Sequence, residues 1–158
     1  MKVSAIMSEP VLTCSPETWL AQAARLMRNA DYGILPIIDS DGYVVGIITD
    51  RDICLAIAAS NRSPRAIAVH EVMTQKVVTA RADDDVQVAL AAMKRARVRR
   101  LPVLDAAKHL KGMLSFEDVV VRGAEADGIS ADDVVTTLRT LYERRPMPVD
   151  EGLSPAVA

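Results

Sequence analysis

The sequence repeats itself at an offset of 66 residues, and this repeat limits the folds that the chain can adopt. Residues 3–53 align with residues 69–119 without a gap, and twelve of these 51 positions are identical. Many of the other positions exchange similar residue types, such as Thr49 with Ser115. A gapless match of this length is typical of a duplicated structural unit. Since 158 residues suffice for one compact domain or for two small halves that share a core, we expect two similar halves in one structure.

Each copy is predicted to fold as β-α-β-β-α. Short apolar runs at Val11–Thr13 and Val77–Thr79 indicate a first strand in each copy. The helix that follows is expected to begin at residues 15–17 (Ser-Pro-Glu), which offer an N-cap, a proline in the first turn and an early acid. In the second copy, three aspartates at residues 83–85 lie where the helix dipole favours negative charge. Apolar residues then recur at i, i+3, i+4 and i+7, which indicates one buried face in each helix: Leu20, Ala23, Ala24 and Met27, and Val86, Ala89, Leu90 and Met93.

Two further strands and a second helix complete each copy. The segments ILPIID (34–39) and RLPVLD (100–105) indicate buried strands. Asp41-Gly42 indicates a tight hairpin into the next strand. Ala107-Lys108 lacks this chemistry at the equivalent place, so its turn is expected to be longer or differently shaped. The second helices are expected to begin in DRDI and FEDV, directly after each hairpin.

The expected organisation is a first repeat at residues 1–60, a polar break at 60–65, and a second repeat at 66–122. Residues 129–145 are predicted to form a further helix, because Ser130 and Asp133 resemble a capping box. Residues 146–158 are rich in proline and lack periodicity, so we expect a disordered tail. The apolar face of the further helix consists of Val134, Leu138, Leu141 and Tyr142.

Composition excludes several classes of protein. The net charge is −2 and the pI about 5.7, which argues against nucleic acid as a partner. No apolar run reaches the ~20 residues that span a membrane, and the first residues do not form a signal peptide. A soluble cytoplasmic protein is therefore expected. The two cysteines have no metal-ligand spacing with the two histidines, so we expect reduced, structural thiols.

The motifs taken together resemble a tandem pair of CBS (cystathionine β-synthase) domains. Each copy has an xxMxxxVxT segment, an LPVxD-like strand and an ending of the form Gly-h-h-[Ser/Thr]-x-x-Asp, where h is apolar. The match covers about residues 1–122. The resemblance implies an α/β (α+β) fold in which the repeats pack sheet to sheet about a pseudo-two-fold axis. It also implies a homodimer that regulates another protein and does not catalyse a reaction. From the residues themselves, no catalytic group and no metal site are expected.

Two [Ser/Thr]-x-x-Asp pairs suit the binding of a ribose: Thr49 with Asp52, and Ser115 with Asp118. An ionised carboxylate accepts charge-assisted hydrogen bonds from a ribose diol, and a neighbouring hydroxyl both donates and accepts. The spacing places both side chains on one side of the new helix, whose N-terminus favours anions. The resemblance implies an adenosine compound in such clefts. AMP, ADP or ATP is the expected regulatory ligand, and no cofactor is required.

The resemblance also implies which residues line two clefts between the repeats. Arg99 and Arg100 precede the second LP strand and are expected to reach the phosphates beside Ser115 and Asp118, since arginine suits bidentate phosphate binding. The cleft with these arginines is therefore predicted to be the better of the two. Its expected lining is Ser115, Asp118, Arg99, Arg100, Met113, Thr13, Gly33 and Ile34, and that of the weaker cleft is Thr49, Asp52, Ile47, Thr79 and Val98.

Other interpretations of these residues stay open. Thr49 and Ser115 also suit helix N-caps, with Asp52 and Asp118 as first-turn acids and no ligand. The basic run at residues 93–100 also suits a solvated helix face or a docking patch for an acidic partner. Our leading hypothesis is a stand-alone regulatory module that senses an adenosine compound and relays it to an unidentified protein partner. The alternative is a ligand-free dimeric scaffold. An enzyme is the weakest class, because no nucleophile, P-loop or metal-ligand spacing is found.

Overall fold

The computed structural model describes residues 1–123 and 129–143 and confirms a mixed α/β fold built from two similar copies. Its elements recur at the offset of the sequence repeat. Helix α1 (Leu20–Ala30) corresponds to α3 (Val86–Ala96), β1 (Ile34–Ile38) to β4 (Arg100–Leu104), and β2 (Val44–Thr49) to β5 (Leu110–Ser115). Helices α2 (Asp50–Ala59) and α4 (Phe116–Gly123) begin at equivalent positions, as do the 3₁₀ turns η1 (Val3–Ala5) and η2 (Val69–Glu71).

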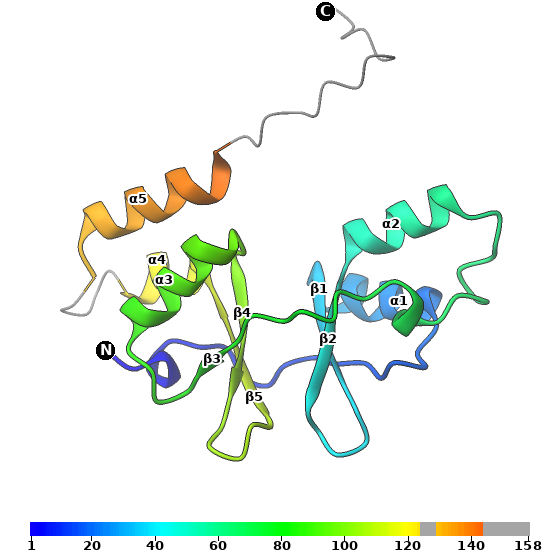
Figure 1. Ribbon diagram of the computed structural model, residues 1–158, viewed down its shortest axis with the longest axis horizontal. Coiled ribbons are helices and arrows are strands. Elements are labelled where there is room, and N and C mark those ends of the chain that lie inside the picture. Colours follow the sequence, from blue (N-terminus) through cyan, green and yellow to red (C-terminus); the bar gives the residue numbers. More distant parts are fainter. Residues whose placement is uncertain (124–128, 144–158) are drawn as a thin grey trace, which may run out of the picture.

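Each copy builds one small sheet, and the two sheets stand side by side between outer helices (Figure 1). Strands β1 and β2 pair antiparallel with Ile34 opposite Thr49, and β4 and β5 pair antiparallel with Arg100 opposite Ser115. Because Thr49 and Ser115 end their strands, both [Ser/Thr]-x-x-Asp motifs lie at the end of the molecule opposite the hairpin turns (Figure 1).

The predicted first strands are wrong in position. Val11–Thr13 forms no strand, and Cys14 instead makes a single parallel bridge to Ile37. In the second copy the strand is β3 (Ala80–Arg81), which lies beyond the predicted Val77–Thr79 and pairs in parallel with β4. The reason is that the predicted runs cross from one half to the other, so only the residues that follow them reach a sheet edge.

The predicted start of the first helix is also wrong. Residues 15–17 form a turn in which the Ser15 N–H donates to Thr18 Oγ1 at 3.1 Å. Helix α1 begins at Leu20, and the N–H of Trp19 donates to Gln22 Oε1 at 3.2 Å. The second copy begins as predicted, because Asp85 caps α3 by accepting a hydrogen bond from the Gln87 N–H at 2.9 Å.

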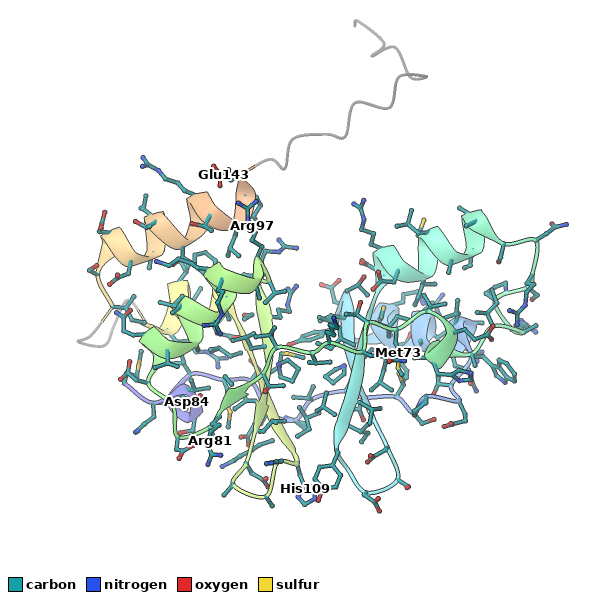
Figure 2. All side chains as sticks on the ribbon, viewed as in Figure 1. Met73, Arg81, Asp84, Arg97, His109 and Glu143 are labelled. Carbon is teal, nitrogen blue, oxygen red and sulfur yellow. The ribbon has the colours of Figure 1, made fainter. Side chains whose placement is uncertain are left out.

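The two hairpin turns are equivalent, which contradicts the expectation of a longer or different second turn. The N–H of Asp39 donates to the Tyr43 carbonyl, and the N–H of Asp105 donates to the His109 carbonyl, both at 3.0 Å. Gly42 has φ 86° in the first turn, and Lys108 adopts φ 68° in the second. Lys108 thus adopts the left-handed conformation that Gly42 has in the first copy. The reason is that the flanking strands pair in the same register in both copies. The rings of Tyr43 and His109 meet across the two turns with their centroids 4.9 Å apart and their planes tilted by 31°, and Figure 2 shows His109 at this end.

The first eight residues of each copy pack in the other copy's half; we call residues 1–8 and 67–74 the leading segments. Val3, Ile6 and Met7 join the core around α3, β4 and α4. Ile67 and Val69 join the core around α1 and β1. Figure 1 shows the N-terminal segment beside the second copy's helices. The sequence repeats are therefore not the packing units, because each core needs a segment from the other copy.

A methionine over a glycine fixes each leading segment against the opposite sheet. A Cβ on Gly46 would lie 2.6 Å from Met73 Sδ, and a Cβ on Gly112 would lie 2.7 Å from Met7 Sδ. Figure 2 shows Met73 beside the first copy's sheet. Reciprocal backbone bonds add to this contact: Ile47 N donates to the Thr74 carbonyl at 2.9 Å and Met113 N donates to the Ser8 carbonyl at 3.0 Å. Only a glycine leaves room for this approach.

Helix α5 (Ala131–Tyr142) follows the duplicated module and lies along α3 (Figure 1). Its expected capping box is present, with Asp133 N donating to Ser130 Oγ at 3.1 Å. Val134 and Leu141 pack against the second copy's core, whereas Leu138 and Tyr142 remain 42% and 60% exposed. The predicted apolar face is therefore only half covered. The expected tail, residues 146–158, lies outside the described residues.

Replacement of Gly112 by alanine tests the leading-segment contact. The new methyl group meets Met7 and the Ser8 carbonyl oxygen, which lies 3.2 Å away on the backbone, so we expect the free energy of unfolding to fall by about 1–3 kcal/mol. Chemical denaturation measures this change. Combining Gly112→Ala with Met7→Ala should cost less than the sum of the two single changes; additive costs would contradict direct packing.

Replacement of Lys108 by glycine tests the second turn. A left-handed residue with a Cβ costs roughly 1–2 kcal/mol, and glycine loses about 0.5–1 kcal/mol more backbone entropy on folding. Lys108→Gly should therefore raise the free energy of unfolding by about 0.5–1 kcal/mol. Lys111→Gly, at an exposed strand position of β5, is the control and should lower the free energy of unfolding. Destabilisation by Lys108→Gly would show that the lysine side chain contributes more than its backbone strain costs.

Candidate functional site: two clefts between the repeats

Both [Ser/Thr]-x-x-Asp pairs form helix caps. Thr49 Oγ1 accepts from Asp52 N at 3.2 Å, while Asp52 Oδ2 accepts from Thr49 N at 2.9 Å and from Thr49 Oγ1 at 2.6 Å. Ser115 and Asp118 make the same three bonds at 3.0, 2.9 and 2.5 Å. The cap uses only Oδ2 of each aspartate. The capping interpretation and the ligand interpretation are therefore compatible, because the cap leaves the second carboxylate oxygen of each aspartate for another partner.

The second oxygen distinguishes the two copies. Asp118 Oδ1 accepts from Ser8 Oγ at 3.3 Å and lies 3.8 Å from Arg122 Nη1. Arg122 Nη1 also donates to the Ile6 carbonyl at 2.9 Å, which holds the leading segment over this carboxylate. The Asp118 side chain is 14% exposed. No donor among the described residues bonds Oδ1 of Asp52, although Thr74 is the repeat equivalent of Ser8.

A cavity of about 580 Å³ lies beside Thr49 and Asp52. Drug-sized ligands occupy pockets of about 300–1,000 Å³, so the volume suits a nucleotide. Residues 33, 34, 47, 49–52, 74, 76–78 and 98–100 line it, and they come from both copies. Ile47 gives an apolar wall, and the N-terminus of α2 gives a partial positive charge. The arrangement thus offers a flat wall, an available carboxylate oxygen and an anion-favouring helix end in one place.

Basic residues outnumber acidic ones around this cavity. Arg51, Lys76, Arg99 and Arg100 oppose Asp50 and Asp52, which gives a local charge of 4 − 2 = +2 in a chain whose net charge is −2. A concave site with this excess attracts anions. The cleft that the arginine count predicted to be weaker thus has four basic residues in its lining.

The guanidinium groups of the two predicted phosphate ligands point in different directions. Arg99 Nη1 donates to Tyr142 Oη at 2.9 Å. Arg100 Cζ lies 5.9 Å from the ring centroid of Tyr32, and Arg100 Nη2 lies 3.8 Å from Glu117 Oε1, next to Asp118 in the chain. Burial raises the pKa of the Tyr32 phenol, while the Arg100 charge acts in the opposite direction. Arg100 therefore lines the Thr49/Asp52 cavity and also lies near the start of α4, where Asp118 stands.

The other predicted residues are distributed unevenly. Ile47 and Val98 line the Thr49/Asp52 cavity as expected for that cleft, and Gly33 and Ile34 line it although they were assigned to the other cleft. Thr79 lies outside this lining. Met113 and Ser115 are 0% and 7% exposed. Thr13 lines two other cavities with Cys14, one at the end of β1 and one beside α1, and neither lining contains Asp52 or Asp118.

Sequence reasoning missed Ser8, Thr74 and Lys76. Ser8 and Thr74 directly follow the repeated methionines, and their position in the leading segments places them next to the opposite aspartates. Lys76 stands where the first copy has Pro10, so it was visible as a charge difference between the copies. The repeat alignment contained this signal, but the crossing of the leading segments was needed to interpret it.

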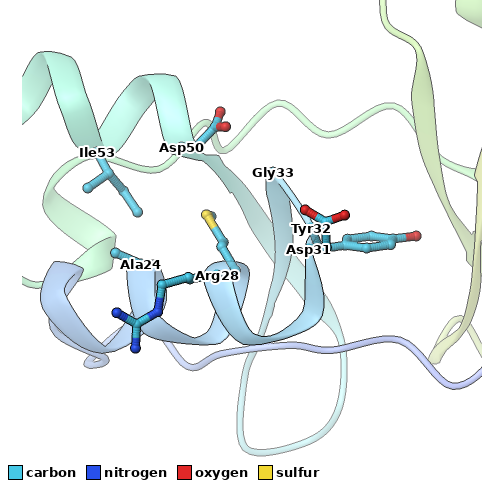
Figure 3. Close-up of a pocket in the computed structure, with 8 residues that line it drawn as sticks. Ala24, Arg28, Asp31, Tyr32, Gly33, Asp50 and Ile53 are labelled. Atoms are coloured by element: carbon cyan, nitrogen blue, oxygen red, sulfur yellow. The ribbon is translucent and has the colours of Figure 1, made fainter.

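A second, smaller cavity of about 330 Å³ lies between α1 and α2 (Figure 3). Its lining includes Arg28, Asp31 and Asp50 around the apolar Ile53. Figure 3 shows the Tyr32 ring pointing away from Ile53. A Cβ on Gly33 would lie 3.1 Å from Asp50 Oδ2, so the short segment after α1 separates this cavity from the larger one. We assign it no ligand.

Within residues 1–123 and 129–143, no cluster of three or more His, Cys, Asp or Glu side chains suits a metal ion. The described helices are also too short or too polar to cross a membrane. Burial raises the pKa of the Cys14 thiol to about 11, so this thiol stays protonated and unreactive near neutral pH.

Removal of each carboxylate tests the difference between the clefts. Asp52→Ala removes a cap and should lower the free energy of unfolding by about 1 kcal/mol. Asp118→Ala also leaves the Ser8 hydroxyl without its acceptor and removes the negative charge beside Arg122, and should cost about 1–2 kcal/mol more. Urea denaturation of the two variants measures the difference. An equal or larger loss at Asp52 would contradict the closed geometry at Asp118.

Comparison with known proteins supports this architecture. The model of the CBS domain family matches the chain twice, at residues 3–59 and 69–125. Homoserine O-acetyltransferase of Methanohalobium evestigatum is 34% identical over 74% of this chain, which covers 23% of that protein. Inosine-5′-monophosphate dehydrogenase of Methanocaldococcus jannaschii is 32% identical over 77% of this chain and is covered to 23%. The chain thus spans less than a quarter of these enzymes.

Solved structures give the same result. The CBS domain pair of protein MJ0100, in complex with 5′-methylthioadenosine and S-adenosyl-L-methionine, is 29% identical with a TM-score of 0.70, covering 80% of this chain and 98% of that one. CBSX2 in complex with AMP is 25% identical with a TM-score of 0.68, covering 78% and 96%. Protein TA0289 of Thermoplasma acidophilum, at 21% identity and a TM-score of 0.73, shares the fold and covers 89% of this chain and 75% of its own. The two family matches, the gapless repeat and the paired sheets place the chain in the CBS domain family, as a tandem CBS pair.

Proposed function

We propose that this CBS pair is a regulatory module that binds an adenosine-containing ligand, AMP, ADP or ATP, in the cleft of Thr49 and Asp52. The observation that carries the proposal is the contrast between the two carboxylates. Asp52 keeps one oxygen that no donor among the described residues bonds, beside a cavity of about 580 Å³. The equivalent oxygen of Asp118 is bonded by Ser8.

Each part of a nucleotide has a counterpart in this cleft. The ribose hydroxyls donate to Asp52 Oδ1 and to the hydroxyl of Thr49. The adenine ring packs against Ile47, and its edge meets the backbone near Val98 and Ile34. The phosphates lie toward the α2 N-terminus and the basic residues of the lining, including Lys76. These assignments combine the sequence expectation with the lining of the cavity.

The order that we propose for the two clefts differs from the order that the arginine count favoured. We propose the Thr49/Asp52 cleft as the first binding site, because its carboxylate oxygen adjoins the cavity. The Ser115/Asp118 cleft is then a second site, which opens only when Ser8 leaves Asp118 and Arg122 releases the Ile6 carbonyl. Arg100 serves this second cleft through its position near Glu117 and Tyr32.

The relatives support the ligand class. MJ0100's CBS pair was solved with 5′-methylthioadenosine and S-adenosyl-L-methionine, and CBSX2 was solved with AMP. These three compounds share the adenosine group and differ in what is attached to the ribose 5′ position. The ligands of these relatives thus have adenosine in common and differ in the group at the 5′ position. We propose the same ligand class for this chain.

The proposed output is a change in the packing of the two halves. The Thr49/Asp52 cleft contains residues of both copies, so a ligand there binds best when the halves take one relative position and shifts the population toward it. We propose that a homodimer relays this change to an unidentified protein partner and that the module itself performs no catalysis.

Isothermal titration calorimetry tests the site. Wild-type protein is titrated with AMP, ADP, ATP, S-adenosylmethionine and adenosine, and the titrations are repeated with Asp52→Asn and Asp118→Asn. Loss of the charge-assisted bonds, about 1.5–3 kcal/mol, should weaken binding to Asp52→Asn by about 10- to 100-fold. Asp118→Asn should bind the first equivalent with nearly wild-type affinity. Thermal denaturation with ligand at 100 times its Kd should show about 2.7 kcal/mol of stabilisation.

The possible results separate the proposals. No heat with any compound would refute ligand binding for this set. Equal weakening by both variants would refute the order of the clefts. Lys76→Ala should weaken ATP more than adenosine, whereas Lys111→Ala, on the exposed face of β5, should change neither.

A ligand-free dimeric scaffold is the second candidate. The observation that favours it is a set of exposed apolar side chains on α2, α4 and α5, including Leu55, Val121 and Tyr142 at 54%, 70% and 60% exposure. Under this alternative, sedimentation should show a dimer that the double variant Asp52→Asn/Asp118→Asn forms as well as wild type. No adenosine compound should change its stability.

A further inference from the structure

The end of α5 holds the segment that forms one wall of the Thr49/Asp52 cleft. Arg99 Nη1 donates to Tyr142 Oη at 2.9 Å, and the guanidinium carbon lies 5.8 Å from the centre of the tyrosine ring. Arg97 Nη2 pairs with Glu143 Oε2 at 3.1 Å, at the site that Figure 2 shows above α3. Both arginines flank Val98, and Val98 and Arg99 line the cavity. A helix outside the two CBS repeats is thus connected to the candidate ligand site by two adjacent contacts.

The charges of the three neighbouring arginines are balanced differently. Arg97 has a carboxylate partner in Glu143, and Arg100 lies 3.8 Å from Glu117. Arg99 has no carboxylate partner within the described part of the chain; its side-chain hydrogen bond is to a neutral phenol. An arginine bonds a phosphate bidentately and with charge assistance, which is roughly twice as strong as a bond to a neutral group. Arg99 therefore gains most from an anion in the cavity.

From these contacts we propose that Tyr142 is a positioning residue that competes with a ligand phosphate for Arg99. In the ligand-free protein, Tyr142 keeps the guanidinium on α5. A phosphate-bearing adenosine ligand draws Arg99 into the cleft, breaks the bond to Tyr142 and loosens the last turn of α5. Adenosine lacks the phosphate and leaves this contact intact. The inference rests on the proposed function, and it makes α5 the element that reports phosphate rather than nucleoside.

The coupling between phosphate binding and the contact of Arg99 with Tyr142 must be reciprocal. If phosphate binding weakens the contact between α5 and Arg99, removal of that contact must strengthen phosphate binding by the same factor. The part of the contact that phenylalanine removes is one hydrogen bond, whose net contribution corresponds to a factor of about two to ten in affinity. Tyr142 is 60% exposed, so replacement by phenylalanine removes the hydroxyl without disturbing the core.

Calorimetry with ATP and with adenosine tests the proposal. Tyr142→Phe should bind ATP about two- to tenfold more tightly than wild type and adenosine equally well. Tyr43→Phe, a tyrosine at the hairpin end, is the matched control and should change neither. Hydrogen exchange supplies a second readout: saturating ATP should speed exchange of the amides of Leu138–Tyr142 in wild type, and saturating adenosine should not.

Each result is decisive. Unchanged or weaker ATP binding by Tyr142→Phe would overturn the competition and leave the proposed function standing. An equal change for ATP and adenosine would show that Tyr142 acts only on the general stability of the cleft wall, which also overturns it. Absence of binding of either compound to wild type would overturn the proposed function and this inference together.

Discussion

The exchange of the leading segments is the constraint on which the rest of the structure depends. Met7 packs over Gly112 and Met73 packs over Gly46, each so closely that a single added methyl group would overlap the sulfur. Neither core is complete without the segment from the other copy. The two halves therefore cannot separate without exposing apolar surface, and a chain built from two small sheets acquires the burial of a larger domain.

The same exchange creates the clefts and makes them unequal. After crossing, each leading segment passes the capped aspartate of the opposite copy. Ser8 closes Asp118, whereas Thr74 and Lys76 leave Asp52 open and add a positive charge. The pseudo-symmetric frame thus holds two aspartates in different states: Oδ1 of Asp118 accepts a hydrogen bond from Ser8, and Oδ1 of Asp52 has no donor among the described residues. Helix α5 adds a further asymmetry, because it has no counterpart in the first copy and contacts the wall of the open cleft through Arg99.

The sequence predicted the elements better than their connections. Positions such as Leu35 and Leu101, or Gly46 and Gly112, fixed the register of the copies, and the helices and hairpins recur at that offset. The exchange could not be read from the repeat, because Met7 on Gly46 and Met7 on Gly112 satisfy the same pattern. The ranking of the clefts stays a prediction that ligand binding must test: the alignment counts arginines but does not show that Arg99 bonds Tyr142 or that Ser8 reaches Asp118. Lys108 was misjudged because strand pairing, not turn propensity, sets the geometry of that hairpin.

A structure from crystals grown with ATP tests most directly whether a nucleotide binds first in the Thr49/Asp52 cleft. We expect density for the nucleotide in the Thr49/Asp52 cleft, with the ribose hydroxyls within hydrogen-bond distance of Asp52 Oδ1. At substoichiometric ATP, Ser8 should remain bonded to Asp118. Nucleotide bound only beside Ser115 and Asp118, with the Thr49/Asp52 cleft empty, would contradict the claim that the available carboxylate oxygen selects the site.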